Sequence, residues 1–146
     1  LLPSATRPYE VMFYAPRSSW QRKGSDLTAA VAQAWAMQSD PHTGIFVGGY
    51  PAPPDAVATG LTALGAISHD QLMTTLENTR IVVFMTRNDN LPNIVGEAIG
   101  RGAKVITTSY SGASEFPGGG IITTNETNPI ALAALIRDVL TQKEIS

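Results

Sequence analysis

The chain has 146 residues, with 10 basic and 12 acidic side chains, a formal net charge of −2 and no cysteine. This length predicts one domain with a single core, and the charge balance excludes a global positive field that would hold nucleic acid or an anionic membrane, so any anion must be bound locally. The lack of cysteine excludes disulfides, thiolate metal sites and a thiol nucleophile, and we expect a cytoplasmic protein.

The two histidines, His42 and His69, are far apart in the sequence, and neither has a second metal ligand at helical spacing. We therefore expect ordinary surface histidines rather than a zinc site. No apolar run approaches the length of a membrane span, and no charged-then-apolar signal begins the chain. Because the chain begins at Leu1, we expect that it starts inside a longer protein.

Strand-like and helix-like stretches alternate along the chain, which is typical of an open α/β sheet with parallel strands. Strands are predicted at 11–14, 43–47, 61–64, 81–85, 104–108 and 120–123, and helices after Ser25, the Ser68–Gln71 capping box, the Asn90–Pro92 turn and Asn128–Pro129. The prolines between 51 and 54 predict a loop. We expect a doubly wound, mainly parallel sheet of about five to six strands with helices on both faces, which binds ligands at the carboxyl ends of its strands.

The most informative stretch follows the predicted strand at 81–85. Two acids, Asp89 and Glu97, flank the start of a helix with seven residues between them. Asp89 therefore lies in the loop and Glu97 inside the helix. The free amides of the Asn90–Asn93 turn and the positive end of the helix dipole face the space between, which suits a phosphate. A carboxylate at such a place is useful when the ligand also carries a sugar diol, because it accepts two strong hydrogen bonds.

This stretch resembles the paired-acid signature of the retaining GT-B glycosyltransferases, the glycosyl transferases of group 1. The usual signature has glutamate at both ends, whereas here the first acid is Asp89, which is one methylene shorter. The resemblance implies that Asp89 contacts the donor sugar and that Glu97 binds the nucleotide ribose. The resemblance also implies that the residues between the two acids contact the donor, namely Asn90, Leu91, Pro92 and Asn93. The following residues 102–108 and 111–115 are similar to the family's next strand and its glycine-glutamate loop.

The amino-terminal part is similar to the same family. Residues 13–17 and 23–27 resemble its first strand, arginine and lysine–glycine elements, with Pro16 in place of the usual glycine and one extra residue between Arg17 and Lys23. The resemblance implies that Arg17 and Lys23 neutralise the departing diphosphate, and Arg22 competes for either role. Further on, the resemblance implies a glycine turn at Gly49 and a backbone segment at Ala66 and Ile67 that faces the nucleobase.

The resemblance covers about residues 11–140, in the family's order. It implies a linker at 1–10, a nucleotide-sugar-binding C-terminal domain at 11–146, and an acceptor-binding N-terminal domain in the same protein or a partner chain. The implied reaction is hexosyl transfer from a UDP- or GDP-sugar with retention, in polysaccharide biosynthesis, without metal or other cofactor. We expect no activity from this domain alone, no nucleic-acid partner, and membrane association only through absent parts or a lipid-linked acceptor.

Other interpretations remain open. The chain could be a non-catalytic nucleotide-sugar-binding module or half of a GT-B-fold sugar-nucleotide epimerase. A dinucleotide-binding module is disfavoured because no close glycine fingerprint follows 11–14. Arg17 and Lys23 could be ordinary surface cations, and Asp89 and Glu97 a loop acid and a solvated helical residue. We expect Trp20 to pack between its loop and the sheet rather than to cover the site.

Overall fold

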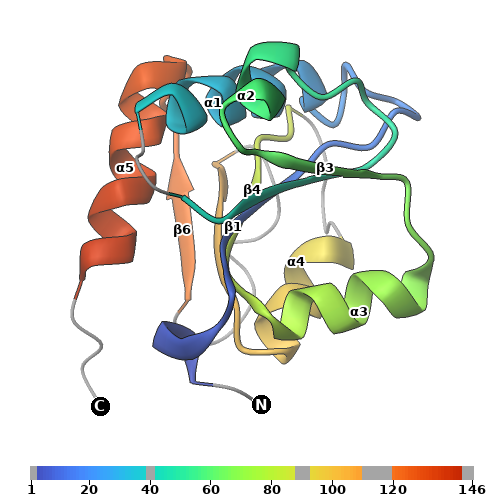
Figure 1. The fold of residues 1–146 in the computed structure, drawn as a ribbon, viewed down its shortest axis with the longest axis vertical. Coiled ribbons are helices and arrows are strands. Elements are labelled where there is room, and N and C mark those ends of the chain that lie inside the picture. Colours follow the sequence, from blue (N-terminus) through green and yellow to red (C-terminus); the bar gives the residue numbers. More distant parts are fainter. Residues whose placement is uncertain (1–2, 39–41, 88–92, 110–119, 143–146) are drawn as a thin grey trace.

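The computed structural model describes residues 3–38, 42–87, 93–109 and 120–142. Its centre is a six-stranded sheet, fully parallel, with the strand order β3-β2-β1-β4-β5-β6 (Figure 1). The strands are β1 (Tyr9–Tyr14), β2 (Gly44–Val47), β3 (Thr62–Gly65), β4 (Thr79–Phe84), β5 (Lys104–Thr108) and β6 (Ile121–Thr124). The predicted doubly wound α/β fold is confirmed. The strand order reverses between β1 and β4, and open parallel sheets bind ligands at this kind of switch point.

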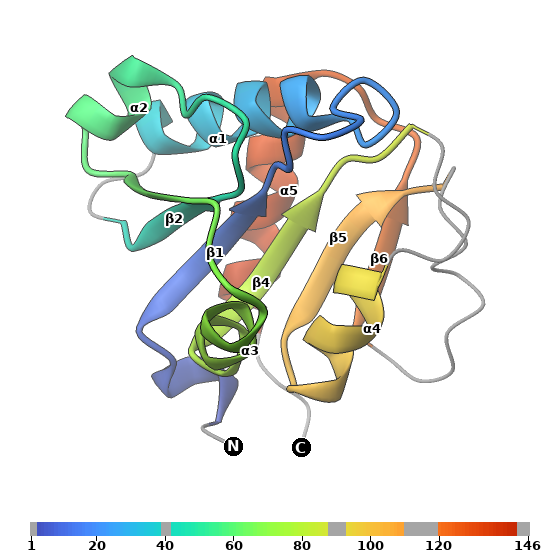
Figure 2. The same cartoon turned by 90° about the vertical axis from the view of Figure 1, so that its right-hand side faces the viewer.

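Helices cover both faces of the sheet, as expected. One face carries α1 (Ser25–Gln38), α2 (Pro54–Ala58) and α5 (Pro129–Thr141), and the other carries α3 (His69–Glu77) and α4 (Asn93–Gly100) (Figure 2). A short 3-10 helix at Ser4–Thr6 precedes β1. In the described parts of the chain, no helix has the length and apolar character that crossing a bilayer requires.

Alternate residues of the central strands point to opposite faces, so the sheet separates two hydrophobic clusters. Val11 and Phe13 of β1 belong to the cluster under α1 and α5, whereas Met12 belongs to the cluster under α3 and α4. In the first cluster, Trp35 is 1% exposed and its ring lies 5.6 Å from that of Phe13. Burial on both faces explains why the strand at 81–85 is apolar without alternation.

Two of the predicted helix starts are confirmed in detail. The Ser68 hydroxyl accepts a hydrogen bond from the Gln71 amide at 3.2 Å, and the Gln71 side chain accepts one from the Ser68 amide at 3.0 Å, which completes the capping box. The Asn128 side chain accepts hydrogen bonds from the amides of Ile130 and Ala131 at the start of α5. Both caps satisfy amides that would otherwise lack a partner in the first turn.

Other local predictions are corrected. Ser25 does not precede its helix but is the first residue of α1, and its hydroxyl donates to the Pro16 carbonyl at 2.6 Å. The proline-rich stretch is not entirely loop, because Pro54 occupies the first turn of α2, where the missing proline N–H costs nothing. Strand β4 begins at Thr79 rather than residue 81, and Thr79 is fully buried.

Arg7 holds the ends of two helices at the amino edge of the sheet. Its side chain is buried, with 5% of the residue exposed. The guanidinium donates hydrogen bonds to the carbonyls of Leu76 at 3.3 Å, Thr79 at 3.0 Å and Arg101 at 2.7 Å. Leu76 lies in the last turn of α3 and Arg101 directly follows α4, so the cation also faces the negative ends of both helix dipoles.

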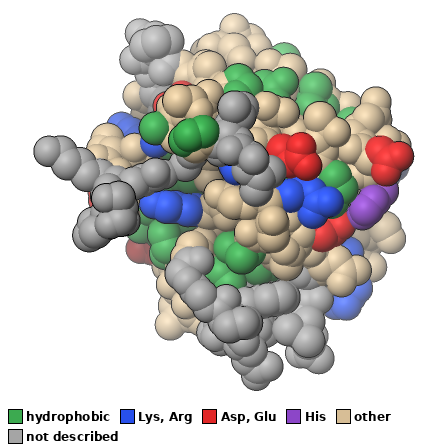
Figure 3. Space-filling view, turned by 90° about the horizontal axis from the view of Figure 1, so that it is seen from below, with side chains coloured by type: hydrophobic (Ala, Val, Ile, Leu, Met, Phe, Trp, Pro, Cys, Tyr) green, Lys and Arg blue, Asp and Glu red, His purple; other side chains and the backbone are tan. Residues whose placement is uncertain are grey.

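Charges of both signs are mixed on the surface. On the face shown in Figure 3, basic side chains lie beside acidic ones, with hydrophobic side chains between them. This distribution agrees with the small net charge of −2. An anionic ligand therefore depends on a local arrangement of cations and amides rather than on the field of the whole domain.

Candidate functional site

The predicted site residues within the described ranges come from segments that follow strand ends at one edge of the sheet, where the arrowheads of Figure 2 point. Arg17 and Lys23 lie in the loop between β1 and α1, Gly49 follows β2, and Ala66 and Ile67 follow β3. Asn93 and Glu97 lie in α4, the helix that comes after β4. The predicted donor contacts at Asp89, Asn90, Leu91 and Pro92, and the acid of the later loop, Glu115, lie outside the described residues.

The loop between β1 and α1 is fastened to the end of β4. Gly24 has a φ of +65°, and a Cβ atom there would lie 1.6 Å from the Met85 carbonyl oxygen. The Arg22 carbonyl accepts hydrogen bonds from the Arg87 amide at 2.8 Å and the Thr86 hydroxyl at 3.2 Å. The backbone on either side of Lys23 is therefore held against the strand end, which limits where the lysine side chain can reach. Arg22 contributes its backbone to this contact, while its side chain is exposed.

Arg87 also ties the loop to α1 through its side chain. The guanidinium forms two hydrogen bonds with the Asp26 carboxylate, at 2.6 and 2.8 Å, and a third with the Gln21 carbonyl at 2.8 Å. The hydrogen bond from Arg87 lowers the pKa of Asp26, and the same pair raises the pKa of Arg87. Arg87 was missed in the sequence analysis, because its partner Asp26 is 61 residues away.

This ion pair predicts an acid-sensitive contribution to stability. The folded-state pKa of Asp26 is below its unfolded value, so the stabilisation is present above the ordinary aspartate pKa, about 4, and is lost as pH falls through the folded value. Asp26→Asn should therefore lower the free energy of unfolding at pH 7 by at most about 1 kcal/mol, because the pair is largely exposed. In urea unfolding, the difference from wild type should shrink at pH 3. The control is Asp138→Asn on the exposed surface of α5, and an undiminished difference at pH 3 would contradict the assignment.

The loops after β1 and β2 approach each other closely beside this edge. The Trp20 ring packs on the Tyr50 ring with 5.7 Å between their centroids, and Trp20 is still 36% exposed. Trp20 was expected to pack between its loop and the sheet, but the ring partner in the structure is Tyr50 of the loop after β2. A Cβ atom on Gly49 would lie 3.2 Å from the Arg17 Cβ, so the glycine lets the Arg17 backbone come close. Arg17 itself is exposed, while Lys23 is half-buried.

Glu97 is held at the junction of three elements. Its Oε2 atom lies 2.7 Å from Nε2 of His69, the first residue of α3. The Glu97 side chain is 25% exposed, compared with 71% for His69. At the end of β1, burial raises the pKa of Tyr14, and the negative charge of Glu97 raises it further. The carboxylate therefore lies near the switch point between β1 and β4, with a histidine on its solvent side.

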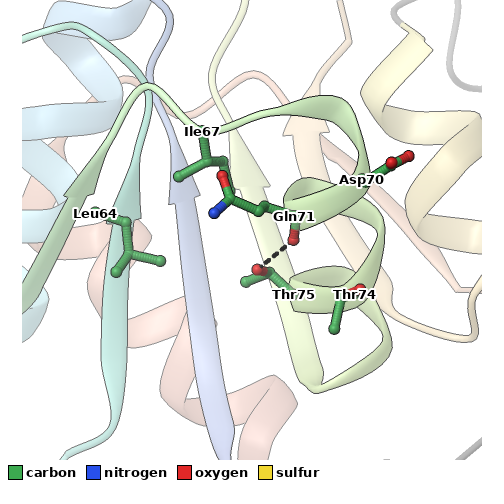
Figure 4. Close-up of a pocket in the computed structure, with 6 residues that line it drawn as sticks. All are labelled: Leu64, Ile67, Asp70, Gln71, Thr74 and Thr75. Carbon is green, nitrogen blue, oxygen red and sulfur yellow. Dashed lines mark hydrogen bonds between the residues drawn. The ribbon is translucent and has the colours of Figure 1, made fainter.

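A groove of about 400 Å³ runs between β3 and α3, next to the predicted nucleobase segment. Leu64, Ile67 and Gln71 point into the space between the two elements, whereas Asp70 points away from it (Figure 4). Thr74 and Thr75 line the part farther along α3, where the Thr75 hydroxyl donates to the Gln71 carbonyl at 2.6 Å. The groove therefore continues from Ile67 along the helix and offers both apolar and hydroxyl contacts.

The chain can now be compared with known proteins. The sequence pattern of the glycosyl transferases group 1 matches residues 9–142. The chain belongs to this family. No curated protein sequence matches it closely enough to count as a relative.

Solved structures of GT-B glycosyltransferases share the fold of this group 1 glycosyltransferase chain. The catalytic domain of cholesterol-α-glucosyltransferase from Helicobacter pylori has a TM-score of 0.63 and 15% identity, over 91% of this chain and 86% of that chain. Anabaena HepE in complex with UDP has a TM-score of 0.64 and 20% identity, over 93% of this chain and 40% of that one. Trehalose-6-phosphate synthase OtsA has a TM-score of 0.67 and 14% identity, over 93% of this chain and 37% of that one. The glycosyltransferase chain thus spans less than half the length of the last two, and at these identities the likeness concerns the fold alone.

Metal binding depends on which acidic and histidine side chains lie together in the described part of the chain. Among residues 3–38, 42–87, 93–109 and 120–142, no three acidic or histidine side chains gather in a way that would hold a metal ion. His69 and Glu97 form a pair without a third ligand in those ranges. Their arrangement is that of a hydrogen bond between an imidazole N–H and a carboxylate.

Proposed function

We propose that the chain is the donor-binding domain of a glycosyltransferase that moves a hexosyl group from a nucleotide diphosphate sugar to an acceptor with retention. The observation that carries the proposal is the half-buried Glu97 carboxylate near the switch point between β1 and β4, in a member of the group 1 family. An ionised carboxylate there accepts the two hydroxyls of a ribose, which leaves the diphosphate to the neighbouring cations and amides.

The protein's chemical task is to stabilise charge as the bond between the anomeric carbon and the phosphate oxygen breaks. The electron pair of that bond goes to the departing diphosphate, the acceptor oxygen attacks the face that the diphosphate leaves, and the proton of the acceptor hydroxyl passes to an oxygen of the departing diphosphate. Arg17, Lys23 and the amides at the start of α4 would neutralise the developing negative charge without a metal. The anchoring of the loop at Gly24 and Arg87 supports this role, because fixed charges need no rearrangement during the reaction.

The donor is a UDP- or GDP-sugar in this proposal. One solved neighbour binds UDP, and another structure of the same protein is in complex with UDP-glucose, which supports a nucleotide diphosphate sugar as the class of ligand. The acceptor would bind to a second domain, in the same protein or a partner chain, and the product would belong to polysaccharide biosynthesis. We expect no transfer by this domain alone, because the acceptor surface lies outside it.

Substitution of the two acids tests the proposal. Glu97→Gln should weaken binding of both the nucleotide diphosphate and the complete sugar donor by roughly ten- to a hundredfold, which is the size of a charge-assisted hydrogen bond. Asp89→Asn should weaken only the complete donor, because Asp89 is proposed to contact the transferred sugar. Calorimetric titrations with a chelator present measure both affinities.

The matched control is Glu77→Gln, at the other end of α3, which should change neither affinity. Melting temperatures of the free proteins must stay unchanged, since a loosened α4 would harm both ligands for a trivial reason. Equal losses on both ligands for Asp89→Asn, or none for Glu97→Gln, would contradict the roles of the paired acids. A strict need for a divalent ion would contradict the metal-free site.

A further inference from the structure

His69 occupies a fixed position beside the proposed ribose-binding acid. It is the first residue of α3 and lies inside the Ser68–Gln71 capping box, whose two hydrogen bonds fix the backbone of this first turn. Its Nε2 atom is 2.7 Å from the Glu97 Oε2 atom, although the two residues are 28 positions apart in the sequence. The contact therefore joins α3 to α4 across the carboxyl edge of the sheet.

The hydrogen bond leaves the carboxylate able to receive a diol. A carboxylate has two oxygens and about four lone-pair directions, and the imidazole N–H uses one of them. Both Glu97 oxygens can therefore still accept a hydroxyl. A free glutamate side chain loses rotational entropy when a ligand fixes it, and a partner that holds it beforehand removes part of this cost from ligand binding.

Tyr14, at the end of β1, lies near the Glu97 carboxylate. The tyrosine ring packs edge-on against Phe84, with 5.7 Å between the centroids, and the pKa of its hydroxyl is raised by burial and by the Glu97 charge. The Tyr14 hydroxyl therefore stays neutral, so it does not draw cations away from a bound ligand. The Glu97 side chain thus has a half-buried ring from β1 nearby and an exposed imidazole from α3 within hydrogen-bond distance.

We propose that His69 is a positioning residue for the nucleotide: its imidazole N–H holds the Glu97 carboxylate in the orientation that accepts the two ribose hydroxyls. This inference rests on the proposed function, in which Glu97 binds ribose. It predicts that His69 contributes to affinity only for ligands that carry the ribose diol. His69 would thereby sharpen the preference for ribonucleotides over nucleotides that lack these hydroxyls.

The test compares nucleotide binding by His69 variants. UDP, GDP and ADP are titrated into the wild-type chain, and the tightest of them is then compared with its 2′,3′-dideoxy form. His69→Ala should weaken the ribonucleotide by roughly three- to tenfold, which corresponds to the loss of one hydrogen bond. It should not weaken the dideoxynucleotide further. His69→Gln places an N–H at the position of Nε2 and should restore most of the affinity, whereas the shorter Asn should not.

A double substitution and a neighbouring control separate positioning from a structural effect. In the Glu97→Gln background, His69→Ala should cause little additional loss, because the group that it positions is already changed. Asp70→Asn, in the same first turn of α3, should leave the affinity for the ribonucleotide within about twofold of wild type.

Each outcome decides between distinct explanations. Tighter ribonucleotide binding by His69→Ala would show that the imidazole competes with the ribose, and an equal loss on the dideoxynucleotide would show that it acts elsewhere. Either result, or no change, overturns the role of His69. If Glu97→Gln weakens binding while His69→Ala does not, the proposed function survives and only this inference fails. If the wild-type chain binds none of the three ribonucleotides, the proposed function itself fails.

Discussion

Gly24→Ala is expected to destabilise the domain by about 3 to 5 kcal/mol. Two effects add at this position: the positive φ of +65° strains any residue with a Cβ, and that Cβ would lie 1.6 Å from the Met85 carbonyl oxygen. The backbone must therefore move away from β4, and the loop that carries Arg17 and Lys23 moves with it. Urea unfolding measures the loss, and nucleotide titration of the surviving folded protein should show weaker binding as well.

Substitutions of two other glycines separate the cost of backbone strain at positive φ from the cost of a steric clash. Gly65 has a similar φ of +67° but no atom within 4 Å of an added Cβ, so Gly65→Ala should cost only about 1 to 2 kcal/mol. Gly100, at the end of α4, also has open space and carries no positive φ, so Gly100→Ala should be neutral or stabilising by up to about 1 kcal/mol. If Gly24→Ala cost no more than Gly65→Ala, the loop would not be seated on β4 as described.

Arg7→Ala is expected to lower the free energy of unfolding by about 3 kcal/mol or more. The substitution removes a buried cation that donates to the carbonyls of Leu76, Thr79 and Arg101, and these carbonyls lose a charged donor in a place with little water. The shift in the urea midpoint at unchanged slope measures the effect. Because the contact lies at the amino edge of the sheet, nucleotide affinity at low temperature should stay near wild type.

Arg137→Ala is the matched control for this substitution. Arg137 is exposed on α5 and donates one hydrogen bond to the Gln38 side chain at 3.1 Å, so its loss should cost less than about 0.5 kcal/mol. Equal effects of Arg7→Ala and Arg137→Ala would mean that the buried guanidinium does not anchor the helix ends. A loss of nucleotide affinity with Arg7→Ala, at a temperature where the variant is folded, would show that the two edges of the sheet are coupled.

The fold was predictable because its signals are local. The capping box at Ser68, the Asn128 cap and the apolar run at 81–85 each depend on residues within a few positions of one another. The errors have a tertiary cause. Ser25 looked like a cap, but the backbone enters α1 through Gly24 packed on β4, and the Ser25 hydroxyl is used by the Pro16 carbonyl instead. No local pattern indicates where that loop is anchored.

The positions of the candidate site residues relative to the sheet were predictable, but their pairings were not. Motif order brought Arg17, Lys23 and Glu97 to strand ends at one edge of the sheet. The partners that hold this edge in place, Asp26 with Arg87 and His69 with Glu97, are 61 and 28 residues apart. Which residues form such pairs depends on how the helices that connect the strands pack on the sheet. Residue types alone do not determine that packing. His69 was correctly expected at the surface, yet its hydrogen bond with Glu97 was not. The same expectation was wrong for His42, whose ring nitrogens are buried and whose ring packs on Trp35.

The Arg7 contacts also have a consequence for folding during synthesis on the ribosome. Arg7 is synthesised before the Arg101 carbonyl that it binds, which comes 94 residues later. Protein synthesis proceeds at about 5 to 20 residues per second. Arg7 and the first strand are therefore made roughly 5 to 20 seconds before that partner. The apolar side chains of Val11, Met12 and Phe13, which are fully buried in the folded domain, lack part of their packing partners during this interval. The nascent chain should therefore be most exposed to chaperone binding and misassociation before residue 101 leaves the exit tunnel.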